Sequence, residues 1–111
     1  MKLRFRVTVL KVRAGSRLAP GATHEVETPL TVGRGAEAQL RLDDETVSQF
    51  HARFSAGEYG IQITNRSQRG TTFFNRARMS LGETRRLGEG RTTLQLGGVL
   101  LLIQPIVTTR E

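Results

Sequence analysis

Apolar and polar residues alternate along much of this chain with the period of two that is typical of β-strands. Leu3, Phe5, Val7 and Val9 would share one face of an opening strand, and Arg or Thr occupies the positions between them. No window shows a sustained helical period, and glycines separate the short apolar segments. The pattern predicts strands at residues 3–9, 24–27, 30–33, 39–42, 52–55, 59–64, 71–74, 84–87, 92–96 and 99–104.

These short strands indicate an all-β fold, either a sandwich or a barrel. Residues 13–22 contain Gly, Pro and Ser and are expected to form a loop. A chain of 111 residues has the length of one domain. We expect that domain to span residues 1–106, with residues 107–111 as a tail or the start of a linker, because Pro105 closes the last strand.

The composition excludes several classes of protein. The chain has no cysteine, which excludes a disulfide framework, a zinc knuckle and a thiol nucleophile. Its longest apolar run, residues 99–103, is far too short to span a bilayer. Charged residues interrupt the N-terminal region, where a signal peptide would need an apolar core. We therefore expect a cytoplasmic protein with no membrane association, no metal and no cofactor.

The formal net charge of +7 is unevenly distributed. Residues 1–22 contain six Lys or Arg and no acidic residue, whereas residues 23–60 contain three Arg against seven Asp or Glu, a net of −4. Residues 61–91 contain seven Arg against two Glu, a net of +5. Such a charge favours anionic partners without separating nucleic acid from a phosphorylated peptide. Because the chain has only five Phe and one Tyr on which bases could stack, we expect no nucleic acid partner.

Three polar motifs lie between predicted strands. Arg34 stands between two glycines, and its planar guanidinium could bind two oxygens of one phosphate group. Ser48 and His51 form a Ser-x-x-His motif, and a polar loop with a glycine follows at 67–71. An arginine, a hydroxyl and a glycine-containing loop suit the capture of a phosphate, although each motif alone is also compatible with an ordinary solvated loop.

Ser48 and His51 also raise the alternative of a nucleophile and its base in a hydrolase. That chemistry needs a third group that orients the histidine, an oxyanion hole and usually a Gly-x-Ser-x-Gly elbow, which the chain lacks. The nearest carboxylates, Asp43 and Asp44, are not placed in a way that singles them out. The sequence therefore predicts a protein that is not an enzyme.

The order and spacing of Thr31-Val-Gly-Arg34, Ser48-Gln-Phe-His51 and Asn65-Arg-Ser-Gln-Arg-Gly-Thr71 resemble the forkhead-associated (FHA) domain, a reader of phosphothreonine peptides. The resemblance extends over about residues 5–104. It implies an all-β sandwich of about eleven short strands, with the binding loops at one end. The phosphopeptide-binding positions that it implies are Arg34, Ser48, Gln49, Gln68 and Arg69, and the positions that would support the binding loops are Gly33, His51 and Gly70.

Position 69 departs from the family pattern, which usually has an asparagine that clamps the peptide main chain. Arginine only donates hydrogen bonds and reaches farther than asparagine. Arg69 would therefore contact the phosphate or an acidic peptide residue, or else the clamp is lost. The spacing between Thr71 and Asn75 is also one residue longer than usual, so the strand would be bulged or the following turn rebuilt.

The resemblance predicts a non-catalytic signalling module that binds a phosphothreonine-containing protein or peptide, within a larger multidomain signalling protein. The alternative is a degenerate FHA scaffold that mediates protein–protein interaction without phosphorylation. The C-terminal half would present either a solvated sheet face or a basic surface that recruits acidic residues around the phosphothreonine, formed by Arg76, Arg78, Arg85, Arg86 and Arg91.

Overall fold

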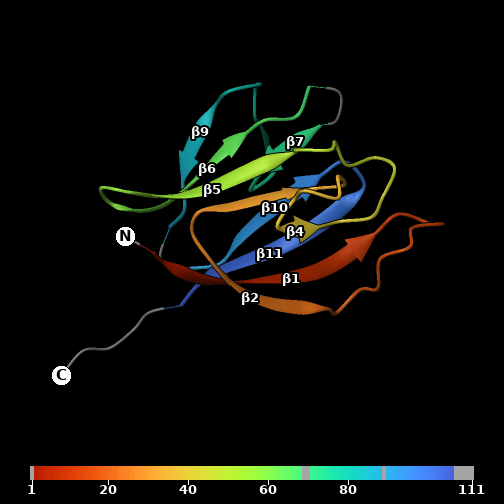
Figure 1. Ribbon diagram of the computed structural model, residues 1–111, viewed down its shortest axis with the longest axis horizontal. Helices are drawn as coiled ribbons and strands as arrows, with labels where there is room; N and C mark the ends of the chain where they lie inside the picture. The colour runs from red at the N-terminus through yellow and green to blue at the C-terminus, as the bar shows by residue number, and fades with distance from the viewer. Residues whose placement is uncertain (1, 69–70, 89, 107–111) are drawn as a thin grey trace.

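The computed structural model describes residues 2–68, 71–88 and 90–106, which form eleven strands in two packed sheets (Figure 1). The described residues contain no helix. The six-stranded sheet has the order β2 (Thr23–Glu27), β1 (Arg4–Val12), β11 (Val99–Pro105), β10 (Thr92–Leu96), β7 (Thr72–Phe74) and β8 (Ala77–Arg78). The five-stranded sheet has the order β4 (Leu40–Arg41), β3 (Leu30–Gly33), β5 (Ala52–Gly57), β6 (Gly60–Asn65) and β9 (Thr84–Arg86). The prediction of an all-β sandwich is confirmed.

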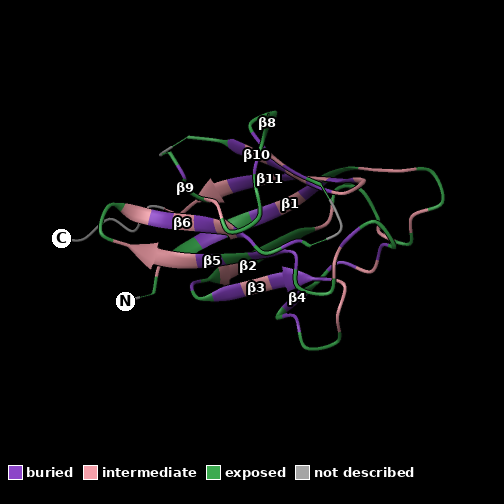
Figure 2. Ribbon diagram, turned by 90° about the horizontal axis from the view of Figure 1, so that it is seen from above, coloured by how far each residue is buried: buried purple, intermediate pink, exposed green. Residues whose placement is uncertain are grey.

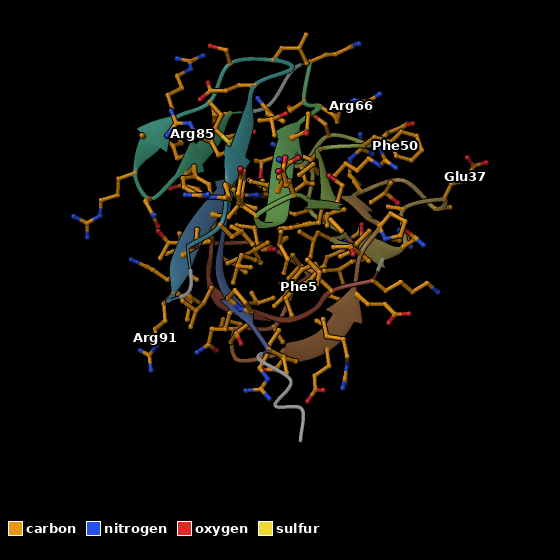
Figure 3. The ribbon with its side chains drawn as sticks, turned by 90° about the vertical axis from the view of Figure 1, so that its left-hand side faces the viewer. Phe5, Glu37, Phe50, Arg66, Arg85 and Arg91 are labelled. Carbon is orange, nitrogen blue, oxygen red and sulfur yellow. The ribbon has the colours of Figure 1, made fainter. Side chains whose placement is uncertain are left out.

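The core lies between the two sheets and is built from the inward faces of alternating strands. Buried and half-buried positions alternate along β6, as the colouring in Figure 2 shows. Phe5 of β1, which Figure 3 labels in the interior of the molecule, and Phe54 of β5 are both fully buried. Their ring centroids lie 4.7 Å apart, so one aromatic pair joins the two sheets. Aromatic pairs at this separation stabilise a fold by about 0.5–1.5 kcal/mol beyond the area they bury.

Strand ends differ from the sequence prediction where pairing extends the local pattern. The alternation predicts that the first strand ends at residue 9, but β1 continues to Val12 because it pairs with β11 beyond a register shift between Val9 and Lys11. Leu10, in that shift, is the extra residue of a β-bulge. The predicted loop at residues 13–22 is confirmed.

The long spacing after Thr71 is accommodated in a turn and not in a bulge. β7 pairs with β10 in unbroken register from Thr72 to Phe74. Asn75 and Arg76 then adopt positive φ values of 49° and 72° and connect β7 to β8. Two such residues match a type I′ hairpin turn, whose twist suits paired strands. The sequence pattern did not predict β8.

The ends of the described chain lie far from the loops that carry the polar motifs. Phe5 pairs with Pro105, and the backbone N–H of Ile106 donates to the Arg4 carbonyl at 2.9 Å, so β1 begins beside the end of β11. The opposite end of these two strands contains Val12, Val99 and the β10–β11 turn. Figure 1 shows the β3–β4 segment and the loop after β1 extending at that opposite end.

Candidate functional site

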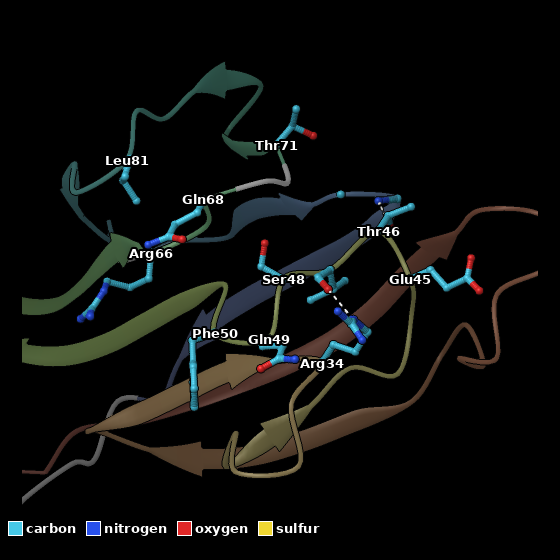
Figure 4. Close-up of a pocket in the computed structure, with 13 residues that line it drawn as sticks. Arg34, Glu45, Thr46, Ser48, Gln49, Phe50, Arg66, Gln68, Thr71 and Leu81 are labelled. Atoms are coloured by element: carbon cyan, nitrogen blue, oxygen red, sulfur yellow. Dashed lines mark hydrogen bonds between the residues drawn. The ribbon is translucent and has the colours of Figure 1, made fainter.

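An open groove of about 860 Å³ lies at the loop end of the sandwich (Figure 4). Its walls come from the loop after β3, the segment between β4 and β5, the segment after β6 and the β10–β11 turn. The groove brings together four of the predicted binding residues, namely Arg34, Ser48, Gln49 and Gln68. Arg69 and Gly70 lie outside the described residues.

Arg34 is held in the groove by the loop opposite it. Its backbone N–H donates to the Ser48 carbonyl at 2.9 Å, and its side-chain Nε donates to the Val47 carbonyl at 3.0 Å. The two terminal nitrogens of the guanidinium make no hydrogen bond or ion pair with the described residues. One edge of the guanidinium is therefore fixed, while its remaining donors are available to a ligand.

Gly33 allows the two loops to approach each other closely. A Cβ atom at this position would lie 2.1 Å from the Gln49 carbonyl oxygen, a distance that no side chain can adopt. The neighbouring Gly35 donates its backbone N–H to the same carbonyl at 3.1 Å. This contact gives a physical reason for a glycine before Arg34.

Ser48 connects the central loop to the segment after β6. Its Oγ lies 2.7 Å from the Oγ of Ser67, and either hydroxyl could donate that hydrogen bond. Its backbone N–H donates to Nδ1 of His51 at 3.0 Å. The histidine thus contacts the Ser48 main chain and not its hydroxyl, which differs from the arrangement that activates a serine nucleophile.

His51 is fully buried behind the groove and organises the loops on both sides. Because Nδ1 accepts the Ser48 N–H, the ring proton is on Nε2, which lies 2.9 Å from Thr72 Oγ1 and 3.2 Å from the Thr71 carbonyl. Burial lowers the pKa of His51 to about 4, and the hydrogen bond to the Thr71 carbonyl raises it only in part. His51 is therefore neutral at pH 7 and makes hydrogen bonds to the segments on both sides of it, and its role as a support of the binding loops stays a prediction.

The network continues from His51 to Asn65, which the sequence reasoning did not single out. Thr72 Oγ1 donates to Asn65 Oδ1 at 2.8 Å, and the same oxygen accepts the backbone N–H of Ser67 at 3.1 Å. The Asn65 amide nitrogen donates to the carbonyls of Met79 and Ser80 at 3.2 and 3.1 Å. One buried amide thus fixes the segment after β6 against the segment before β9.

A second cluster supports the loop between β4 and β5 from the other side. Asp44, buried with a side-chain exposure of 0%, accepts hydrogen bonds from Arg13 Nε at 3.0 Å and from the Thr46 backbone N–H at 2.9 Å. Thr46 Oγ1 also donates to Asp44 and accepts the Gly98 N–H at 2.7 Å. Burial raises the pKa of Asp44, but the nearby Ser16 hydroxyl, together with the hydrogen bonds from Thr46 and Arg13, holds it well below its ordinary value. Asp44 is a carboxylate at pH 7.

The rim of the groove includes four residues that the sequence motifs did not identify as part of the site. Arg66 lines the groove and is exposed, and Phe50 and Leu81 leave 46% and 61% of their surfaces accessible. Arg66 was detectable from alternation, because it follows the β6 positions that point outward. Phe50 lies inside the Ser-x-x-His motif, but no local pattern reveals that its ring faces solvent. Glu45, with its side chain 92% exposed, also borders the groove and lies 3.8 Å from Arg13.

A family model for the FHA domain matches residues 30–97, which is more than half of the chain. No curated protein sequence matches the chain. Several solved FHA domains share its fold. The FHA domain of the CT664 protein from Chlamydia trachomatis is 19% identical with a TM-score of 0.76, and the match covers 94% of this chain and 99% of that one.

Two further structures show the same likeness. The kinase-interacting FHA domain of the Arabidopsis kinase-associated protein phosphatase is 18% identical, with a TM-score of 0.75 and coverage of 98% of both chains. An FHA domain from a study of phosphothreonine-dependent FHA interactions is 21% identical, with a TM-score of 0.71 and coverage of 95% of this chain and 99% of that one. At these identities, the structures establish the fold alone.

The chain belongs to the FHA domain family, as the sequence resemblance predicts. FHA domains are interaction modules that generally lack catalytic activity. Within the described ranges, no helix is long and apolar enough to cross a membrane. The same residues include no group of three or more His, Cys, Asp or Glu side chains that could hold a metal ion.

Proposed function

We propose that this domain binds proteins or peptides that carry a phosphothreonine, and that it does so without catalysis. The observation that carries the proposal is the placement of Arg34, whose guanidinium is fixed by one nitrogen while its terminal nitrogens remain available in the groove. Membership of the FHA family supports the same conclusion. Gln49, Gln68 and Arg69 would contact the ligand around the phosphate.

The charges of the two partners make this pairing favourable. A phosphothreonine carries about −1.5 to −2 charges at pH 7, and arginine can donate two parallel hydrogen bonds to its oxygens. Ser48 can add a donor that carries no charge when Ser67 donates the hydrogen bond between the two hydroxyls. Each charge-assisted hydrogen bond to the phosphate contributes about 1.5–3 kcal/mol. Loss of two such bonds therefore reduces affinity by at least about a hundredfold.

Substitution of Arg34 tests the proposal. We expect Arg34→Ala to abolish measurable binding of a phosphothreonine peptide pool in an NMR titration, while the spectrum away from the groove stays unchanged. Arg78→Ala, which removes an exposed arginine of β8, is the matched control and should bind as the parent protein does. Phosphoserine and unphosphorylated pools should give weaker shifts or none. Normal binding by Arg34→Ala would exclude this site.

The exposed Phe50 and Leu81 favour a second candidate function. Two apolar side chains on the rim of one groove can bind an apolar segment of a partner without a phosphate. Under this alternative the protein is a scaffold for phosphorylation-independent interaction. The two functions are separated by one comparison, because a scaffold binds its partner equally well before and after phosphatase treatment.

Three broader predictions accompany the proposed function. We propose that residues 1–106 form the binding domain. The expected tail or linker, residues 107–111, lies outside the described residues. We also propose a cytoplasmic location and a parent protein with further signalling domains. Expression of residues 1–106 alone tests the first of these, since an independent domain should unfold in one cooperative transition.

A further inference from the structure

The two outer faces of the sandwich differ in how their charges are paired. On the six-stranded sheet, Arg4 and Arg6 of β1 lie 2.9 and 3.4 Å from the carboxylate of Glu25 on β2. At the edge of the same sheet, Lys2 lies 3.6 Å from Glu27. The arginines of β1 are therefore paired with a carboxylate of the neighbouring strand β2, whereas Arg78, on β8 at the other edge of this sheet, makes no ion pair with the described residues.

The five-stranded sheet has no such compensation on its outer face. Its outward positions on β3, β5, β6 and β9 are occupied by uncharged polar residues or by arginine, and none is acidic. Arg53 lies opposite Thr31 and Thr64, and Arg86 lies opposite Gln62. The outward positions are Thr31, Arg53, Ser55, Gln62, Thr64, Thr84 and Arg86, and Arg41 of β4 is exposed beside them.

The arginines of this sheet differ in their pairing. Arg41, Arg53 and Arg86 make no ion pair with the described residues, whereas Arg85 pairs with Glu83 and lies 5.7 Å from the centre of the Phe74 ring. Arg86 lies near the ring of Tyr59, at 5.7 Å from its centre. An arginine without a carboxylate partner attracts an external anion more strongly, because no neighbouring negative charge offsets its own.

Nearby acidic residues lie in turns and not on the strands of this face. Glu37 belongs to the turn between β3 and β4, and Glu58 belongs to the turn between β5 and β6. Figure 3 shows Glu37 projecting at the periphery of the molecule. The strands between these turns present positive charge without a negative counterpart.

Arg66 connects this face to the groove. Its backbone N–H donates to the His51 carbonyl at 2.9 Å, so the pairing of β5 with β6 continues one step beyond the strands. In Figure 4 the Arg66 side chain leaves the groove on the side of β5 and β6 and points away from Arg34. A ligand in the groove can therefore continue past Arg66 onto the sheet.

We propose that Arg41, Arg53, Arg66 and Arg86, here called the arginine face, bind an acidic segment of the same polypeptide that carries the phosphothreonine. This inference rests on the proposed function of the groove. The six residues of β5 span roughly 20 Å at about 3.3 Å per residue, so about six ligand residues beyond the groove cover the face. A polypeptide fits better than a nucleic acid, because the outward positions of these strands include no aromatic residue, and the exposed ring of Tyr59, in the turn beside Arg86, offers a single stacking surface and not a series of them.

Peptides of matched length test the arginine face. A phosphothreonine peptide is extended at either end by six glutamates or by six glutamines, and each form is titrated by calorimetry. We expect one of the glutamate extensions to raise affinity about fivefold over its glutamine counterpart, which is the effect of two exposed ion pairs. The gain should shrink as salt rises, since charges on an open surface are screened.

Two double variants show whether the gain in affinity comes from the arginine face or from the net charge of the protein. Arg53→Gln with Arg86→Gln should remove the gain from glutamate and leave the affinity for the glutamine-extended phosphopeptide unchanged. Arg78→Gln with Arg91→Gln removes the same charge elsewhere and should retain the gain. Figure 3 places Arg91 on the opposite side of the molecule from Arg66. Equal losses in both double variants, or no gain from glutamate at all, would overturn the proposal.

Comparison of phosphorylated and unphosphorylated peptides distinguishes an error in the proposed arginine face from an error in the proposed phosphothreonine site. If the glutamine-extended phosphopeptide does not bind, the proposed phosphothreonine function fails. The glutamate-extended peptide then still tests the face, because at high peptide concentration it should shift the NMR signals around Arg53 and Arg86 with or without the phosphate. A duplex or single-stranded oligonucleotide that binds through Arg53 and Arg86 more tightly than the glutamate peptide would overturn the assignment to an acidic polypeptide.

Discussion

Lowering the pH from 7 to 5 is expected to destabilise this domain through His51. The neutral ring accepts the Ser48 N–H at Nδ1 and donates from Nε2 toward Thr71 and Thr72. Protonation would place a second N–H on Nδ1, facing the Ser48 N–H that it now accepts. The buried ring would also carry a charge, and no carboxylate in the described part of the chain is paired with it. Acid therefore acts on the residue that supports Ser48 in the groove.

The magnitude follows from the difference between the folded and unfolded pKa. Burial lowers the pKa of His51 from 6.5 to about 4, so the unfolded chain takes up the proton first as the pH falls. The stabilisation from neutral His51 is complete above pH 6.5 and is lost progressively between 6.5 and 4. At about 1.4 kcal/mol per pH unit within this window, the free energy of unfolding should fall by about 2 kcal/mol between pH 7 and pH 5.

Urea unfolding at pH 7, 6 and 5 measures this loss. Substitution of His24, which is exposed on β2, by glutamine leaves His51 as the only histidine and simplifies its titration by NMR. We expect the ring of His51 to remain neutral at pH 5 and the midpoint of unfolding to move to lower urea. A folded-state pKa of 6.5 for His51, or a free energy of unfolding that is constant from pH 7 to 5, would refute the reasoning.

Two substitutions test the support of the loop between β4 and β5. Asp44→Ala removes the acceptor for Thr46 and Arg13 and should lower the free energy of unfolding by roughly 2 kcal/mol in urea, since hydrogen bonds to a buried charge are strong but Arg13 is partly solvated. Glu45→Ala, at a side chain that is 92% exposed, is the control and should change it by less than about 0.5 kcal/mol. Gly97→Ala places a Cβ 2.1 Å from the Thr46 carbonyl at a φ of +60°, so it should destabilise the fold and shift the NMR signals of residues 44–48. Gly82 has a similar φ of +83° with open space around it, so Gly82→Ala should lower the free energy of unfolding only by the roughly 1–2 kcal/mol of that conformation. Equal effects of the two glycine substitutions would contradict the contact with Thr46.

The sequence predicts the longer strands because side-chain alternation is a local property. β3 and β10 have the predicted limits, and in each strand every second residue faces the core. These residues are apolar except Thr92, and the terminal Gly33 beside them is also buried. β8 could not be predicted in this way, because Ala77 and Arg78 are both exposed and a two-residue strand carries no period. Its pairing comes from the turn at Asn75 and Arg76, where two non-glycine residues adopt positive φ.

The residues of the candidate site can be predicted from sequence motifs, but the contacts that hold its loops in place cannot. The resemblance of three motifs, in their order and spacing, to the FHA family selected Arg34 and Ser48, which the fold brings to one groove, and their role in binding stays a prediction. The pairing of Arg13 with Asp44 joins residues 31 positions apart, and no local pattern identifies it. Gly98 and Thr46 are 52 positions apart in the sequence, and their hydrogen bond forms only when the two sheets have packed together. A local pattern of residues carries no information about contacts between positions this far apart.

The meeting of β1 and β11 at the end remote from the groove has a practical consequence. β11 alone spans roughly 20–25 Å at about 3.3 Å per residue, so anything attached near Arg4 or Ile106 is held at about that distance from a bound ligand. A fluorescent protein, a biosensor surface or a neighbouring domain can therefore be joined at either point without blocking access to the groove. Because the two points are adjacent, a short designed linker can close them into a circular permutant with new ends in an exposed turn.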